Sequence, residues 1–130
     1  MTYRNIFDSA VAQIAEKVGS YDVSDYEERA GYILASFCAI TADADKRYRA
    51  ANRLPAVTQP ETACVDLDSV LTLHTVFAPV AAYYLAANLT ADENEAMSDR
   101  FFALYSDAIS LILSTLPCSS SSISDVYGLM

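Results

Sequence analysis

The chain has 130 residues, of which 53% are hydrophobic and only three are glycine. This length and composition exclude a disordered chain and indicate one globular, mainly helical domain with a small core. The net charge is −9, and residues 54–130 carry nine acidic side chains against a single basic one, Arg100. A surface built from this half repels nucleic acid rather than binding it.

The cysteines and the apolar runs indicate the compartment. Cys38, Cys64 and Cys118 are widely spaced and form no CxxC pair, which predicts free thiols in a reducing compartment. The first residues lead directly into an amphipathic helix, without an apolar signal segment. The longest apolar run, about residues 76–89, is shorter than the roughly 20 residues that a bilayer span requires. We expect a soluble cytoplasmic protein without membrane contact.

Two helices are predicted in the first half of the chain. The first covers about residues 3–18, and Gly19 is well placed to end it. The second covers about residues 23–51, where apolar residues recur every three or four positions. Pro55 disfavours helical geometry in the residue before it and so limits this helix. Gly31 lies inside the apolar stripe, and we expect it to let another helix approach closely.

An extended arm is predicted next, over about residues 55–74. Residues 65–73 alternate between apolar and polar side chains, which is typical of a strand or an extended segment. Because the sequence contains only one such segment, its pairing partner would have to be the preceding loop, the C-terminal tail or another subunit. Val65, Leu67 and Leu71 are therefore candidate interface residues.

The second half predicts a helical hairpin. Its first helix starts near Phe77, with Pro79 in the first turn, where the missing N–H of proline has no helical partner to lose. An acidic turn at residues 92–95 leads to a second helix that ends near Leu116, before Pro117.

The C-terminal residues predict a tail. Four serines at residues 119–122 form a flexible joint. They lead to an apolar peptide whose candidate interface residues are Ile123, Val126, Tyr127 and Leu129. The sequence therefore predicts a mainly α fold: a four-helix domain over residues 1–118 with one extended arm, and a flexible C-terminal peptide over residues 119–130.

No catalytic, cofactor or metal site is predicted. His74 is the only histidine, and a zinc site would need a second histidine or a CxxC pair. No spacing pairs His74 with a cysteine nucleophile. The acidic residues of the hairpin lack the alternation and central glycine of a calcium loop, and they indicate a solvated turn that complements the helix dipole. We expect a protein that is not an enzyme and takes no cofactor.

Two groups of residues are candidates for contacts with partners. Half of the basic residues lie together near the end of the second predicted helix: Lys46, Arg47, Arg49 and Arg53. They form either a solvated helix end that complements the dipole or a docking patch for an acidic partner surface, such as the acidic half of a neighbouring subunit. The chain also contains nine tyrosines, more than a small bundle can bury with every hydroxyl satisfied. Tyr83 and Tyr84 are therefore candidate interface residues.

Residues 71–87, LTLHTVFAPVAAYYLAA, carry a resemblance to a known family, together with residues 92–95 and the sequence FFALY at residues 101–105. An extended segment ending in Leu-x-Leu, a Phe-x-Pro helix start, a Tyr/Ala-rich helix, an acidic turn and an amphipathic helix resemble the head–tail connector proteins of the phage neck. The first half is similar to small proteins of prophages from Firmicutes. The resemblance covers about half of the chain.

This resemblance implies a structural protein of the virion neck, with no enzymatic activity. It implies a homo-oligomeric ring of about twelve copies. The ring would dock on the portal protein and on the next neck or tail protein, and DNA would pass through it without specific binding. An alternative from another class is a small acidic regulatory or inhibitory protein that binds a host or phage protein. The two hypotheses differ in whether the protein assembles.

Overall fold

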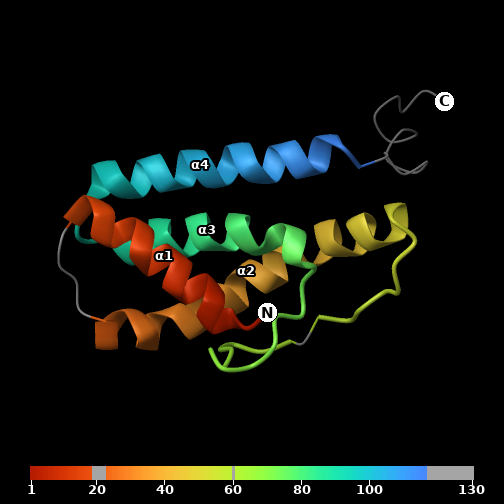
Figure 1. The fold of residues 1–130 in the computed structure, drawn as a ribbon, viewed down its shortest axis with the longest axis horizontal. Helices are drawn as coiled ribbons and strands as arrows, with labels where there is room; N and C mark the ends of the chain where they lie inside the picture. The colour runs from red at the N-terminus through yellow and green to blue at the C-terminus, as the bar shows by residue number, and fades with distance from the viewer. Residues whose placement is uncertain (19–22, 60, 117–130) are drawn as a thin grey trace.

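The computed structural model describes residues 1–18, 23–59 and 61–116. These residues contain four α-helices and one short 3-10 helix: α1 (Tyr3–Val18), α2 (Val23–Ala51), η1 (Thr75–Phe77), α3 (Ala78–Thr90) and α4 (Glu95–Ser114). The predicted mainly α fold is confirmed, and the helices begin and end within a few residues of the expected positions (Figure 1). The predicted tail, with Ile123, Val126, Tyr127 and Leu129, lies outside the described residues.

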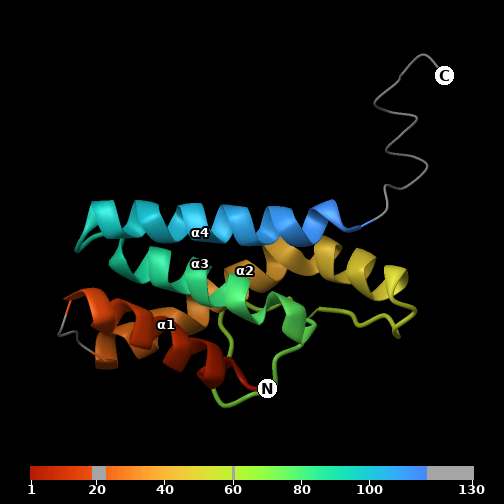
Figure 2. The same ribbon diagram turned by 45° about the horizontal axis from the view of Figure 1, so that its top comes forward.

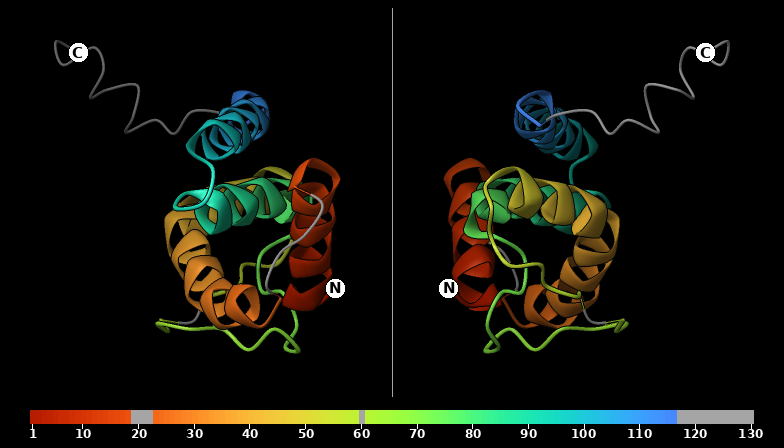
Figure 3. Two further views of the ribbon diagram at one scale, coloured as in Figure 1. Left: turned by 90° about the vertical axis from the view of Figure 1, so that its left-hand side faces the viewer. Right: turned by 90° about the vertical axis from the view of Figure 1, so that its right-hand side faces the viewer.

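Helix α3 lies at the centre of the fold. It packs against α1 and α2, and α4 covers it from the other side (Figures 2 and 3). Nine of its thirteen residues are buried, and four of the nine are consecutive pairs of alanine at positions 81–82 and 86–87. Short side chains reduce the distance between packed helices, so an alanine-rich helix can contact three neighbours at once.

The α3–α4 hairpin is antiparallel, as the sequence predicts. The side chain of Asn94 accepts a hydrogen bond from the backbone N–H of Met97 (3.1 Å) and so caps the start of α4. The hydroxyl of Ser98 donates to the backbone carbonyl of Ala87 (2.7 Å) and joins the two helices. Helix α4 is the outermost element, and it leaves Phe102, Leu104 and Leu111 exposed.

Helix α2 ends at Ala51 in a backbone motif that was not predicted from the sequence. Arg53 adopts a left-handed conformation (φ 58°). The N–H of Leu54 bonds to the carbonyl of Arg49 (2.8 Å), and the N–H of Arg53 bonds to the carbonyl of Ala50 (3.2 Å). These two bonds form a Schellman motif, which satisfies carbonyls at the end of the helix. Arg53 therefore lies beyond the helix and not on its face.

The arm is extended, but it is not a strand. Within the described residues its only β-type pairing is one isolated antiparallel bridge, between Thr2 and Val70. Its carbonyls instead accept hydrogen bonds from the start of α1. The N–H groups of Tyr3 and Arg4 donate to the carbonyls of Ser69 (3.2 Å) and Leu67 (2.7 Å) respectively. The first N–H groups of a helix have no partner within the helix. The arm supplies those partners, so the prediction that it needs a partner outside the helices is wrong.

The alternation in the arm correctly marks its inward side chains, but not their role. Val65, Leu67 and Leu71 are buried in the core of the chain, as is Leu73. These side chains contact the chain's own helices, so they are not available to a neighbouring subunit. Their assignment as interface residues is therefore corrected.

Gly31 allows a close approach, although the neighbour is the arm and not a helix. A Cβ atom at Gly31 would lie 2.7 Å from the backbone oxygen of Val65 and 2.7 Å from the sulfur of Cys64. The N–H of Val65 donates to the carbonyl of Gly31 (3.0 Å), which holds the two backbones together. Only glycine fits here, because the backbone of Val65 occupies the space of a side chain.

We predict that Gly31→Ala destabilises the protein, although alanine is the better helix former. The methyl group would clash with the backbone of Val65, and overpacking of this kind costs about 1 to 3 kcal/mol. Urea denaturation followed by circular dichroism measures the change. Ser36→Ala is the matched control, because it makes a similar helix-favouring change at an exposed position of α2. A stabilised Gly31→Ala variant would show that the arm does not approach α2 this closely.

Candidate functional site

A buried polar cluster joins α2 to the arm. Its centre is Asp45, whose side chain is 1% exposed. One carboxylate oxygen accepts from the backbone N–H of His74 (2.7 Å). The other accepts from the guanidinium of Arg49 (3.0 Å) and from the side-chain amide of Gln59 (3.2 Å). Arg49 and Gln59 also donate to the backbone carbonyl of Thr72. Both oxygens of the carboxylate are thus used to hold the chain together.

The cluster continues from the arm to α1. The hydroxyl of Thr72 bonds to the side-chain oxygen of Gln59, and the phenol of Tyr3 lies 3.2 Å from the same hydroxyl. The phenol also contacts the thiol of Cys38 (3.4 Å). Burial raises the pKa of both Tyr3 and Cys38, because the apolar surroundings disfavour the charged forms. Cys38 is therefore a protonated, structural thiol and not an activated nucleophile.

His74 begins η1 and contacts no cysteine among the described residues. Its Nδ1 atom accepts a hydrogen bond from the N–H of Val76 (3.1 Å), so a neutral ring carries its proton on Nε2. The ring packs on that of Tyr48, with centroids 4.7 Å apart. Through these contacts His74 acts as the residue that caps the start of η1.

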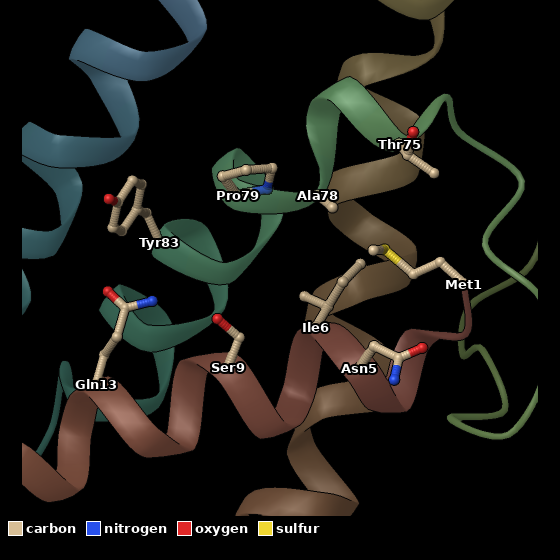
Figure 4. A pocket seen from close by; sticks show the side chains of 9 residues that line it. All are labelled: Met1, Asn5, Ile6, Ser9, Gln13, Thr75, Ala78, Pro79 and Tyr83. Carbon is tan, nitrogen blue, oxygen red and sulfur yellow. The ribbon is translucent and has the colours of Figure 1, made fainter.

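A groove runs between α1 and the start of α3 (Figure 4). Its volume is about 420 Å³. Its apolar lining consists of Met1, Ile6, Ala78 and Pro79. Its polar lining consists of Asn5, Ser9, Gln13, Thr75 and Tyr83. Asn5, Ser9 and Gln13 follow one another along α1 at intervals of one turn, a signal present in the sequence that we did not use as a site prediction.

The four basic residues near the end of α2 do not form one patch. Arg49 points inward to Asp45, and its side chain is only 14% exposed. Lys46 and Arg53 are exposed, and Arg47 is half-buried. Within the part of the chain that the structure describes, these three form no ion pair. The expectation that Arg49 belongs to one solvated helix end or docking patch with the other three is therefore wrong, because the buried carboxylate of Asp45 one turn away binds its guanidinium.

Two groups of exposed charges lie at opposite ends of the fold. Lys46, Arg47 and Arg53 form what we call the basic end, at the end of α2 (right in Figure 1). Asp92, Glu95 and Asp99 are all exposed and form the acidic end, at the α3–α4 turn (left in Figure 1). The start of α2 lies at the acidic end, because the Tyr26 hydroxyl donates to Glu93 (2.6 Å). From residue 26 to residue 46 the helix rises about 30 Å.

The two candidate tyrosines of α3 have different surroundings. Tyr84 is half-buried and packs against the rings of Phe37 on α2 (5.4 Å) and Tyr105 on α4 (5.2 Å). Its hydroxyl lies 3.4 Å from that of Ser36. Tyr84 therefore joins three helices of its own chain. Tyr83, by contrast, lines the groove beside α1.

Known proteins do not identify the chain. No family model, no curated protein and no solved structure matches it. Across residues 1–18, 23–59 and 61–116, no three histidine, cysteine, aspartate or glutamate side chains gather closely enough to hold a metal ion. None of the helices that the structure describes combines the length and the apolar character of a membrane span.

We predict that Asp45→Ala lowers the free energy of unfolding by about 3 kcal/mol, because it leaves the largely buried guanidinium of Arg49 without its carboxylate. The double variant Asp45→Ala, Arg49→Met should regain part of this loss. The matched control is Asp43→Ala, an exposed carboxylate on the same helix. Chemical denaturation of the three variants measures the differences. Equal costs for Asp45→Ala and Asp43→Ala would mean that the cluster does not hold the arm.

We predict that the protein loses stability at alkaline pH. Burial raises the pKa of Tyr3, Tyr26 and Tyr105, and in Tyr26 the carboxylate of Glu93 raises it further. The unfolded chain ionises its phenols near pH 10. The folded chain keeps these three protonated to higher pH, so their contribution is complete below about pH 9 and decreases as the pH rises through 10. Tyr26→Phe should flatten this dependence and exposed Tyr32→Phe should not, as measured by urea denaturation between pH 7 and 11.

Proposed function

We propose that this protein is a head–tail connector of a phage neck, a structural virion protein that docks on the portal and forms a ring for DNA passage. The proposal rests first on the resemblance of residues 71–87 and of the hairpin to connector proteins. The observation that carries it is the placement of a basic group of side chains, the basic end, and an acidic group, the acidic end, at opposite ends of the fold.

Opposite charges at opposite ends favour head-to-tail association. The basic end of one copy complements the acidic end of the next, so the contact joins two different surfaces. Such a heterologous contact generates a closed ring when the rotation between copies closes, and a filament when it does not. Electrostatic complementarity of this kind also accelerates association and fixes its register.

The acidic second half supports passage of DNA. A channel through which DNA moves must not hold the phosphates, and counterion release makes basic surfaces adhere to them. The hairpin carries all the acidic residues of the acidic end, and Arg100 is the only basic residue in the second half. A lumen formed by α4 would therefore repel DNA.

A second candidate function is favoured by a different observation. Phe102, Leu104 and Leu111 are exposed along α4, and Leu111 is 70% exposed. An amphipathic helix with apolar side chains on its open face fits a small acidic regulatory or inhibitory protein that binds one partner through α4. Such a protein would remain a monomer or dimer until it meets that partner.

Assembly distinguishes the two functions. We expect the purified protein to form rings, alone or with the portal protein of the same phage, when measured by size-exclusion chromatography with light scattering. Lys46→Glu combined with Arg47→Glu and Arg53→Glu should weaken assembly at least tenfold at low salt, and high salt should weaken the wild type in the same way. Arg49 is left unchanged, because its role lies in the core.

The controls separate the connector from its proposed contact. Arg100→Glu reverses a cation outside the basic end and should leave assembly intact. A mixture of the basic-end variant with Asp92→Lys, Glu95→Lys should assemble better than either variant alone. Rings that the triple reversal does not weaken would refute the head-to-tail contact only. A wild-type chain that forms no ring and never binds portal would refute the connector.

A further inference from the structure

The groove between α1 and α3 has an uncharged lining. Figure 4 shows Gln13 and Tyr83 at one end and Met1 and Thr75 at the other, with Ile6 between them. None of the described side chains that line the groove is charged, in a chain of which 19% of the residues are charged. A charge without a partner is costly to bury. The part of an occupant that fits between these side chains therefore has uncharged side chains.

The spacing of the polar side chains fits an extended polypeptide. Asn5, Ser9 and Gln13 lie four residues apart on α1, which separates them by about 6 Å along the helix. An extended chain repeats every second residue, about 6.7 Å. The side chains of α1 can therefore bond to the backbone of alternate residues of a peptide, while exposed apolar residues of the lining such as Pro79 contact its side chains.

Much of the hydrogen-bonding capacity of this row is unused within the described chain. The Asn5 side-chain oxygen accepts from the N–H and the hydroxyl of Thr2, which leaves its NH₂ group free to donate. No hydrogen bond joins the side chains of Ser9 and Gln13 to other described residues. Backbone groups of an extended peptide need such partners when they leave water. The row thus supplies what a bound backbone requires.

The chain itself contains a segment of the matching chemistry. Residues 126–130, VYGLM, are uncharged and mostly apolar, and they follow Asp125. Extended, these five residues span about 16 Å, which covers the roughly 12 Å from Asn5 to Gln13. We propose that the groove binds residues 126–130 of a second copy in an extended conformation, with Asp125 left at its mouth.

The end of α4 and the groove lie on different sides of α3, which favours a second copy of the chain, rather than the same copy, as the source of the bound segment. Helix α4 packs along one side of α3 (Figures 2 and 3). The groove lies on the other flank of α3, beside α1. This inference rests on the proposed function, because both require that copies of the chain associate, and it names a second contact between them.

A peptide titration tests the proposal. The acceptor is the ¹⁵N-labelled full chain carrying Val126→Asp and Leu129→Asp, which disable its own segment. The ligand is a synthetic peptide of residues 119–130. We expect saturable shifts of the backbone amides of Asn5, Ser9 and Gln13 and of the side-chain amides of Asn5 and Gln13. The same peptide with both aspartates should cause none.

A groove variant locates the binding. Ser9→Arg in the acceptor places a bulky charge on an exposed position of the groove and should weaken the peptide at least tenfold. Ser36→Arg, at an exposed position of α2, should leave its affinity unchanged. Circular dichroism of both variants checks that the helices remain. Absence of binding, or shifts confined to α4 or α2, would overturn the proposal.

Two further outcomes are decisive. Wild-type chain whose groove amides already have the bound shifts at every concentration would place the segment in its own groove, and would refute the second copy as its source. Light scattering on the same samples distinguishes the failures. Rings without peptide binding would refute binding in the groove and leave the connector proposal in place. Peptide binding in a chain that forms no ring and does not bind the portal protein would refute the connector proposal and leave binding in the groove in place.

Discussion

The carboxylate of Asp45 is the constraint on which the fold depends. It lies on α2 in the interior of the chain, where a charge needs several donors to be tolerated. Two of its three donors, the amide of Gln59 and the N–H of His74, come from the segment that joins α2 to α3. A long connection without secondary structure is thereby fixed across the helices, and its carbonyls reach the first N–H groups of α1. The helices depend on the arm as much as the arm depends on them.

The hairpin of α3 and α4 has a different physical basis. Alanines along α3 allow neighbours on several sides, so this helix is almost entirely internal, while α4 contacts the rest of the fold mainly through it. A helix held on one side keeps its other sides open to solvent and partners. The exposed apolar side chains of α4 and the acidic turn before it follow from this position. Surface for contacts is therefore concentrated on the hairpin and at the ends of the bundle.

The polar groups of the interior are occupied by structural bonds. Asp45, Tyr3 and His74 each have partners within the chain, and the thiol of Cys38 is kept protonated by burial. The groups at the surface include the basic end, the acidic end and the groove between α1 and α3. This distribution favours a function based on contact between macromolecules, which is the common element of the connector proposal and of the binding-protein alternative.

The sequence by itself determined the helices, because helix formation depends on local spacing of apolar residues and on local end signals. It also determined which side chains of the arm point inward, since alternation is a local pattern as well. Only the tertiary structure decided where the arm finds its partners, that Arg49 turns away from Lys46 toward Asp45, and that Gln59 and Tyr3 meet at Thr72. The bonds that Thr72 makes with Gln59 and Tyr3 join residues 13 and 69 positions apart, and no local pattern encodes them. The same reason explains the groove: its polar row is visible along α1, but the wall that makes it a groove comes from α3.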